Sequence, residues 1–590
     1  MRATTLASLS ICFCLMMGLL ACSAPPPADS DPLPNVLLIL TDDQGYGDIG
    51  THGNDSIRTP EMDRMAQEGI RLDNFFVSPV CAPTRASLLT GRYHFRTGTN
   101  WVTRNAEAMR GEETTLAELF QANGYATGAF GKWHNGAHGP NHPLGQGFAE
   151  FVGFCAGHWS NYFNPPLEAN HQPIQPEGYI NDILTDSALS FMQRSGDQPF
   201  FCYIPFNTPH TPFIAPQELY EQYLGEGRSK AIASTYGMVE NIDQNLIRLR
   251  KYLEASGQRE NTLVIFMTDN GPNFDRFNGG MKGRKGHVND GGVRVPCLVE
   301  WPGQLTGGTI ISEMTAHIDW LPTFVDLLNL TPVKTLPLDG TSISSLLTGE
   351  AEQLPDRTFY TFAPSIERYR ASVRTRQHRL VITGENEYEL TDFQTDRAEA
   401  NPLTDSLSEV AQSLYEGYLA AFEDVTQGIE LFPPLPLAHP TEPTVILHAH
   451  EGFPTGKAHY KASQWGWAND WFVDWSTPTD SLYWNVDVAE ESEWEVLLRY
   501  SAKPENLGAM LHLTGGEPSI QAELTEPFEP ELIPSRAQLP RKVEALEVTW
   551  AEMPLGSMRL PAGRHRLVLQ ASNIQAGEVA WVRALILKRK

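Results

Sequence analysis

The fold expected of this chain rests on the stretch Val36-Leu37-Leu38-Ile39-Leu40-Thr41-Asp42-Asp43, in which an apolar run passes directly into two carboxylates. Three further apolar runs are equally short and do not alternate strictly between apolar and polar residues; they span residues 125–130, 200–204 and 263–267. Runs of this kind are typical of strands that are buried on both faces of a parallel sheet. Because helical patterns separate them, the sequence predicts an α/β fold with a mostly parallel sheet between helices.

Each predicted strand is followed by polar side chains. In chain order these are Asp42 and Asp43, then Lys132 and His134, then His210, and finally Asp269 and Asn270. Ligands of open α/β sheets bind outside the carboxyl ends of the strands, so we expect these side chains to meet at one edge. Any one cluster could instead be a helix cap or a turn. Together they predict a site for a metal ion and an anion, and oxygen ligands favour Ca²⁺ or Mg²⁺ over zinc.

Length and charge limit the classes of function. With 590 residues, the chain is too long for one hydrophobic core and should hold two or three domains. The formal net charge of −27 weighs against binding nucleic acid or an anionic membrane surface. Any attraction for a small anionic group must therefore come from a few cations gathered in one pocket.

The most specific motif is Cys81-Ala82-Pro83-Thr84-Arg85-Ala86-Ser87-Leu88-Leu89-Thr90-Gly91-Arg92. Pro83 suits the first turn of a helix and Gly91 suits its end, so Cys81 would stand at the helix end that is rich in N–H groups. A lone cysteine is more often a small buried thiol that packs behind a helix. Here the whole string resembles the signature of the type I sulfatases, which are formylglycine-dependent enzymes of the alkaline-phosphatase-like superfamily.

The resemblance implies a modified nucleophile and a metal ion. In that family the cysteine is converted to formylglycine (3-oxoalanine), whose hydrate is the nucleophile, by a formylglycine-generating, sulfatase-maturating enzyme. The family also implies one Ca²⁺ per active site, bound by Asp42, Asp43, Asp269, Asn270 and the modified Cys81. The implied fold is alkaline-phosphatase-like, with a small antiparallel subdomain after the catalytic sheet.

The family further implies roles for the cations. Arg85 lies one helical turn after Cys81 and can reach back to it, and Lys132 is expected to neutralise sulfate oxygens. The match to the family's Lys-Gly followed by acid-Gly-Gly places the catalytic lysine at Lys285, since the spacing from Lys282 is wrong by three residues. Asp290 stands where many relatives have Glu.

Proton transfers complete the scheme that the resemblance implies. One hydroxyl of the hydrate attacks sulfur while Asp269 helps to deprotonate it. His210 and Lys285 assist departure of the alcohol. His134 then takes a proton from the second hydroxyl, which expels sulfate and restores the aldehyde.

Three further residues are candidates for contacts with the substrate. Arg104 follows the signature and could bind a sugar hydroxyl or carboxylate, and His158 and Trp159 lie in a loop that could line the pocket. The same loop could equally be packed without touching a ligand.

Composition divides the chain into segments. Residues 1–21 resemble an export signal, and Cys22 follows a lipoprotein-like cleavage box, although plain signal cleavage stays open. The expected parts are a Pro-rich tether at 22–34, a catalytic domain at 35–355, its antiparallel subdomain at 356–430, a Pro-rich linker at 431–444 and a β-sandwich at 445–590. The protein would then be exported to the periplasm or cell surface, as an outer-membrane lipoprotein whose only membrane contact is the lipid.

Tryptophan is concentrated in the last quarter of the chain, where Trp465, Trp467, Trp471 and Trp475 lie close together. These rings could stack on sugars, or they could fill the core of the sandwich. A polysaccharide sulfatase is the leading function. A phosphodiester or phosphonate ester hydrolase and a binding protein with unmodified Cys81 are the alternatives.

Overall fold

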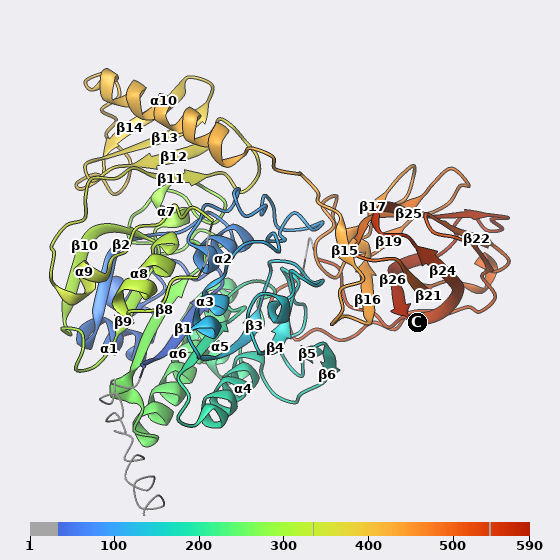
Figure 1. Ribbon diagram of the computed structural model, residues 1–590, viewed down its shortest axis with the longest axis horizontal. Coiled ribbons are helices and arrows are strands. Elements are labelled where there is room, and N and C mark those ends of the chain that lie inside the picture. Colours follow the sequence, from blue (N-terminus) through green and yellow to red (C-terminus); the bar gives the residue numbers. More distant parts are fainter. Residues whose placement is uncertain (1–32, 334–335, 542–543) are drawn as a thin grey trace, which may run out of the picture. The chain divides into compact units, whose positions relative to one another are not determined.

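The computed structural model describes residues 33–333, 336–541 and 544–590 (Figure 1). The expected export signal, Cys22 and the tether up to residue 32 lie outside the described residues. Within the described part, no helix has both the length and the apolar character needed to cross a bilayer.

The predicted α/β sheet is confirmed. The four apolar runs form β1 (Asn35–Thr41), β3 (Ala126–Lys132), β7 (Phe200–Pro205) and β8 (Thr262–Thr268). They are neighbours in the order β8-β1-β7-β3, and every pair is parallel. Their carboxyl ends therefore lie at one edge of the sheet.

Six more strands extend this sheet to ten, in the order β10-β2-β9-β8-β1-β7-β3-β4-β5-β6. They are β2 (Ile70–Phe76), β4 (Glu150–Phe154), β5 (Leu167–Ala169), β6 (Gln172–Ile174), β9 (Cys297–Glu300) and β10 (Thr309–Ala316). The sheet is mixed, because β9 runs antiparallel to β2 and β8, and β5 runs antiparallel to β4 and β6.

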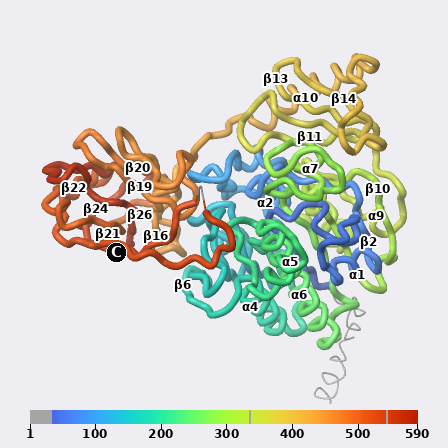
Figure 2. Tube along the Cα trace, turned by 180° about the vertical axis from the view of Figure 1, so that it is seen from behind, coloured from blue at the N-terminus to red at the C-terminus, as the bar shows by residue number. Residues whose placement is uncertain are grey.

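Helices cover both faces of the sheet, because successive side chains of a strand point to opposite sides. Leu37 and Ile39 of β1 share a core with one set of helices, in which α5 and α6 lie side by side (Figure 2). That set is α1 (Pro60–Glu68), α4 (Ile180–Ser195), α5 (Gln217–Gly225) and α6 (Lys230–Ala255). The opposite core contains Leu38 with α2 (Cys81–Thr90), α3 (Leu116–Ala122), α8 (Trp320–Leu327) and α9 (Ser344–Thr348).

A small antiparallel sheet follows, as the resemblance implied. Its strands are β11 (Phe359–Phe362), β12 (Ala371–Arg374), β13 (His378–Gly384) and β14 (Glu387–Asp392). Helix α10 (Ser408–Val425) packs on it through Tyr415, Tyr418 and Phe422, which share a core with Leu380 of β13.

The last part of the chain contains two sheets around one core. The first contains β15 (Leu435–Leu437), β17 (Phe453–Pro454), β20 (Leu482–Val488), β22 (Met510–Thr514), β23 (Ile520–Glu523) and β25 (Gly563–Ser572). The second contains β16 (Thr444–His448), β18 (His459–Tyr460), β19 (Phe472–Val473), β21 (Ser492–Ser501), β24 (Ala551–Leu560) and β26 (Trp581–Arg589). The segment expected as a linker thus carries β15, which pairs with β20.

Tryptophans of this part differ in how far they are buried. Trp471, Trp475, Trp484 and Trp494 are buried in the shared core of the two sheets. Trp465, by contrast, is 47% exposed.

A buried histidine joins the sandwich to the catalytic part. His138 lies with Nε2 3.0 Å from a carboxylate oxygen of Glu451 and Nδ1 3.5 Å from one of Glu442. Burial alone would lower the pKa of His138, but the two carboxylates raise it well above the ordinary value of 6.5. The imidazolium is therefore the form that the folded chain favours.

We expect His138→Gln to destabilise the chain by about 3 kcal/mol, because two buried carboxylates lose their cation. Since folding raises the pKa, this stabilisation is fully present below pH 6.5 and is lost as the pH rises through the folded-state value. Calorimetry should therefore find a lower melting temperature for the variant than for the wild type at pH 6. This difference in melting temperature should become smaller at alkaline pH. His565→Gln, whose Nε2 lies 2.8 Å from the carbonyl oxygen of Pro561, is the matched control. An unchanged difference at every pH would contradict the charged pair.

Candidate active site

The side chains that follow β1, β3, β7 and β8 meet beside the start of α2. Helix α2 begins at Cys81 and ends before Gly91, which adopts a left-handed φ of 69°, as the sequence predicted. Cys81 is buried, and its Sγ lies within 4.8 Å of carboxylate oxygens of Asp42 and Asp269. A second group with the same spacing contains Asp42, Asp43 and His210.

Two oxygens in this cluster are buried without a hydrogen-bond partner among the described residues. They are Oδ1 of Asp42 and Oδ1 of Asn270. The amide of Asn270 is oriented by its Nδ2, which donates to Oδ1 of Asp43 at 2.8 Å. Burying a polar oxygen without a partner is costly. Unpaired carboxylate and amide oxygens, with two more carboxylates beside them, fit a hard cation such as Ca²⁺.

Cations approach the carboxylates from the other side. Lys132 Nζ lies 2.5 Å from Oδ2 of Asp42, and Lys285 Nζ lies 2.6 Å from Oδ1 of Asp43. Arg85 is fully buried and donates to Oδ2 of Asp269 at 3.0 Å. Positive charge is thus concentrated beside Cys81 in a protein that is otherwise strongly acidic.

The burial and these charges shift the acids in opposite directions. Burial would raise the pKa of Asp42, but Lys132, His210 and Arg85 hold it far below its usual range. Burial and the neighbouring charge of Asp42 raise the pKa of Asp269 to about 7. Asp269 can therefore hold a proton near neutral pH, whereas Asp42 stays ionised.

His134 has one free ring nitrogen. It adopts a left-handed φ of 62°, and its Nε2 lies 3.0 Å from the carbonyl oxygen of Val102, to which it donates. Burial and Lys132 hold the pKa of His134 well below 6.5, so the ring is neutral. Its buried Nδ1 has no partner among the described residues and is left as a proton acceptor. Gly157 is required beside it, because a Cβ there would lie 2.1 Å from Nε2 of His134.

His210 is oriented by the backbone that follows β7. Its Nδ1 lies 2.6 Å from the carbonyl oxygen of Thr211, and its Nε2 lies 3.8 Å from Oδ2 of Asp43. Burial and the charge of Lys285 lower the pKa of His210. The ring thus faces the same carboxylate as Lys285.

A cavity of about 290 Å³ opens onto Cys81. His134, His158, His210 and Lys285 also line it, as does Trp467 from the tryptophan cluster, together with residues that the sequence did not single out: Val80, Trp101, Val102, Gly157, Thr211, Ala468 and Glu544. Trp467, Ala468 and Glu544 come from the last part of the chain, so the sandwich region supplies one wall of the cavity. The tryptophan cluster was the one signal in the sequence for a sugar contact by Trp467, and nothing near Ala468 or Glu544 indicated that they would reach the cavity.

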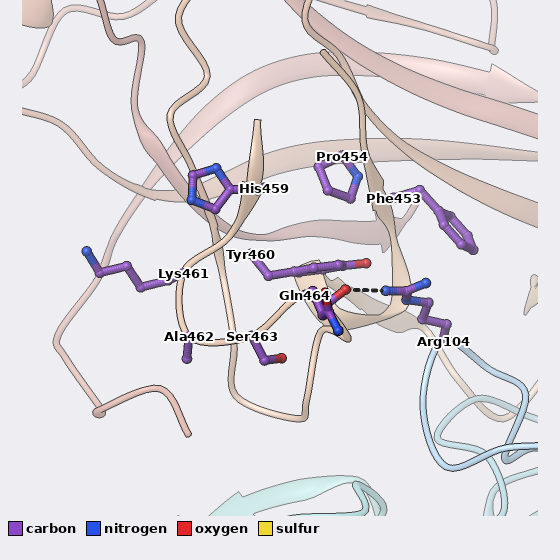
Figure 3. A pocket seen from close by; sticks show the side chains of 9 residues that line it. All are labelled: Arg104, Phe453, Pro454, His459, Tyr460, Lys461, Ala462, Ser463 and Gln464. Carbon is purple, nitrogen blue, oxygen red and sulfur yellow. Dashed lines mark hydrogen bonds between the residues drawn. The ribbon is translucent and has the colours of Figure 1, made fainter. Parts of the chain in front are cut away.

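Two of the three candidate substrate residues lie elsewhere. His158 lines the cavity, 3.6 Å from Oε2 of Glu544. Trp159 stacks on Phe154 instead, with ring centroids 4.7 Å apart. Arg104 belongs to a separate cleft (Figure 3).

Asp290 is a structural residue in this chain. It is buried, and its two carboxylate oxygens bind Arg374 at 2.9 Å and Arg379 at 2.6 Å. These arginines come from β12 and β13, so Asp290, in α7 (Asp290–Val293), ties the antiparallel sheet to the segment that carries Lys285.

Comparisons with known proteins identify relatives of this chain. The sulfatase family matches residues 34–330, and the family described as "N-sulphoglucosamine sulphohydrolase, C-terminal" matches residues 284–419. The chain is 33% identical to the N-acetylgalactosamine-6-sulfatase of Mus musculus over 400 residues, which cover 61% of this chain and 74% of that protein.

Solved structures share the fold. The structure of Ps i-CgsB in complex with k-i-k-neocarrahexaose is 29% identical, has a TM-score of 0.62, and covers 68% of this chain and 94% of its own. The phosphonate monoester hydrolase of Agrobacterium radiobacter is 19% identical, has a TM-score of 0.50, and covers 66% of this chain and 95% of its own. The signature at Cys81, the sheet and the family match lead to one conclusion: this chain belongs to the sulfatase family of enzymes.

Proposed function

We propose that this chain removes sulfate from a sulfated carbohydrate, with Cys81 converted to formylglycine and one Ca²⁺ beside it. The observation that carries the proposal is the convergence of four oxygen-bearing side chains and two lysines on Cys81. We assign the ion to Asp42, Asp43, Asp269, Asn270 and the modified Cys81, whose oxygens suit a hard cation.

The state of the Cys81 thiol supports its conversion. Burial raises the pKa of Cys81, although Lys132 and Lys285 act in the opposite direction. A cysteine that acts directly as a nucleophile needs a lowered pKa. Formylglycine would supply a hydrate hydroxyl at this position instead, and its formation would require a sulfatase-maturating enzyme as a partner.

The surrounding residues divide the remaining work. Lys132 and Lys285 neutralise the oxygens of the bound sulfate, and Arg85 holds Asp269 in place through their ion pair. Asp269 accepts the proton of the attacking hydroxyl. When bound, Ca²⁺ would polarise the sulfate oxygens.

Two histidines serve the later proton transfers. His210 and Lys285 lie on the same carboxylate, Asp43, and assist departure of the alcohol. His134 is the acceptor for the second proton, since its neutral Nδ1 is free.

We propose a sugar as the substrate because relatives act on or hold sugars. The mouse relative is named for N-acetylgalactosamine, and the Ps i-CgsB structure holds a neocarrahexaose. The cavity beside Cys81 offers two indole rings, Trp101 and Trp467, to a sugar face. We also propose export as a lipoprotein anchored at Cys22.

Parallel kinetics test the proposal. We expect sulfate release from sulfated galactose and N-acetylgalactosamine derivatives to exceed phosphate or phosphonate ester hydrolysis in kcat/KM. The phosphonate monoester hydrolase shares the fold, so ester hydrolysis of phosphonates is the second candidate. A higher kcat/KM on phosphonates would favour that candidate, and hydrolysis of neither ester class would favour an unmodified binding protein.

Two neighbouring lysines give a matched pair for the catalytic assignment. Lys285 contacts Asp43 at 2.6 Å, whereas Lys282 is half exposed and lies 3.8 Å from Glu389. We expect Lys285→Met to lower kcat/KM for sulfate release by about 10²- to 10³-fold, the usual cost of a lost charge stabiliser. The kcat/KM of Lys282→Met should stay within about threefold of the wild-type value. Equal losses would contradict the assignment.

A further inference from the structure

A second cleft, of about 520 Å³, lies between Arg104 and segments of the sandwich region (Figure 3). Nine residues line it: Arg104, Phe453, Pro454, His459, Tyr460, Lys461, Ala462, Ser463 and Gln464. Arg104 comes from the loop after the Cys81 motif, and the other eight come from the last part of the chain. In the view of Figure 3, Arg104 and Lys461 lie on opposite sides of the Tyr460 ring.

The cleft is cationic in an acidic protein. The chain holds 71 acidic and 44 basic residues, yet none of the nine lining residues is acidic and three are Arg, His or Lys. Two acids contact the lining residues from outside: Asp470 accepts from the backbone N–H groups of Ala462 at 3.1 Å and Ser463 at 3.3 Å, and Asp474 lies 3.6 Å from Nδ1 of His459. The lining therefore suits an anion, which the net charge of −27 would otherwise repel.

Arg104 is held with donor capacity to spare. Its Nη2 donates to the carbonyl oxygen of Gln464 at 3.0 Å, and its guanidinium lies 5.3 Å from the centre of the Tyr460 ring. Its Nε is buried and has no partner among the described residues. A planar guanidinium with unused N–H groups is a strong ligand for sulfate or carboxylate.

Two loops connect this cleft to the catalytic cavity. In the loop of residues 101–104, Trp101 lines the cavity and Arg104 lines the cleft. In the loop of residues 463–468, Gln464 lines the cleft and Trp467 lines the cavity. The loops are joined where they meet, because Thr103 Oγ1 donates to the carbonyl oxygen of Gly466 at 2.7 Å.

Aromatic rings mark this junction. The centroids of Trp101 and Trp465 lie 6.3 Å apart, and Trp465 is 47% exposed. Exposed indole faces are suited to stack on sugar rings. A chain of sugars that leaves the cavity at Trp101 would thus pass an aromatic surface before it reaches Arg104.

We propose that the cleft binds a second sulfated sugar of the same polymer whose sulfate is removed at Cys81. The proposal rests on the proposed function, and it deepens that function by making the enzyme one that holds a polysaccharide at two places. Arg104, His459 and Lys461 recognise the anionic groups of the distant sugar, and the Trp101–Trp465 pair supports the sugars between.

Binding to the full-length Cys81→Ala variant tests this site without turnover. The probes are carrageenan and chondroitin 6-sulfate oligosaccharides of two, four and six sugars, with neutral neoagarohexaose for comparison. We expect at least one sulfated hexasaccharide to bind about tenfold more tightly than its disaccharide, and the gain to fall as salt is raised.

Charge-removing variants show which residues produce the tighter binding of the longer oligosaccharides. In the Cys81→Ala background, Lys461→Gln and Arg104→Gln should each remove most of the gain from chain length. Lys503→Gln removes the same charge from an exposed part of the sandwich outside the cleft and should keep it. Lys461 is exposed, so its replacement tests the cleft even if Arg104→Gln disturbs the loop.

Several results would overturn the proposal: hexasaccharides that bind no more tightly than disaccharides, neoagarohexaose that binds as well as the sulfated chains, or a Lys461→Gln variant that matches Lys503→Gln. Failure of the proposed function is a separate result, since it would appear as absence of sulfate release from the disaccharides by the wild-type enzyme.

Discussion

Replacing Cys81 by alanine is expected to lower kcat/KM for sulfate release by about 10⁴-fold or more, the scale seen when a nucleophile is removed. The helix should persist, because Cys81 makes no disulfide and its side chain is small. Loss of the small buried side chain at position 81 should cost about 1 kcal/mol of stability. The measurement is sulfate release together with the melting temperature of the same preparation.

Cys202→Ala is the matched control for this variant. Cys202 is also free and fully buried, but it lies inside β7, away from the cavity. We expect the kcat/KM of Cys202→Ala to stay within about threefold of the wild-type value, with a loss of stability similar to that of Cys81→Ala. A Cys81→Ala enzyme that retains most of its activity would refute the proposed nucleophile.

Removal of calcium is expected to have the second largest effect. Asp42, Asp43 and Asp269 are all buried in two groups that share Asp42, and loss of the bound ion would leave the repulsion between these carboxylates less compensated. Dialysis against EGTA should therefore abolish sulfate release and lower the melting temperature. An ion present at about 100 times its Kd contributes about 2.7 kcal/mol to stability.

Metal replacement gives the control for this experiment. Calcium should restore both activity and melting temperature, whereas zinc should restore them poorly, because the site offers oxygen ligands. An enzyme that is equally active and equally stable in EGTA would show that these carboxylates hold no catalytic ion.

The sheet could be predicted from the sequence because its central strands carry a strong local signal. Strands β1, β3, β7 and β8 are buried on both faces, so each appears as a short, uninterrupted apolar run. The polar residues after these strands could be placed at one edge because the carboxyl ends of parallel strands lie together. The outer strands β5 and β6, each three residues long, carry no comparable signal.

Residues that depend on long-range contacts could not be placed in this way. Glu544 and Trp467 reach the cavity only through packing of distant segments, which local patterns do not encode. Arg104 follows the signature closely in sequence and adopts a left-handed φ of 61°. Its side chain nevertheless contacts the distant Gln464, which no local pattern predicts. The sequence allowed Trp159 either to line the pocket or to pack within its loop, and in the structure its ring stacks on Phe154.

The mass of the peptide that contains Cys81, measured on active enzyme purified from its native host, tests the central claim most directly. The account predicts the mass of the aldehyde or its hydrate at position 81. An active enzyme whose peptide carries an unmodified cysteine at that position would contradict it.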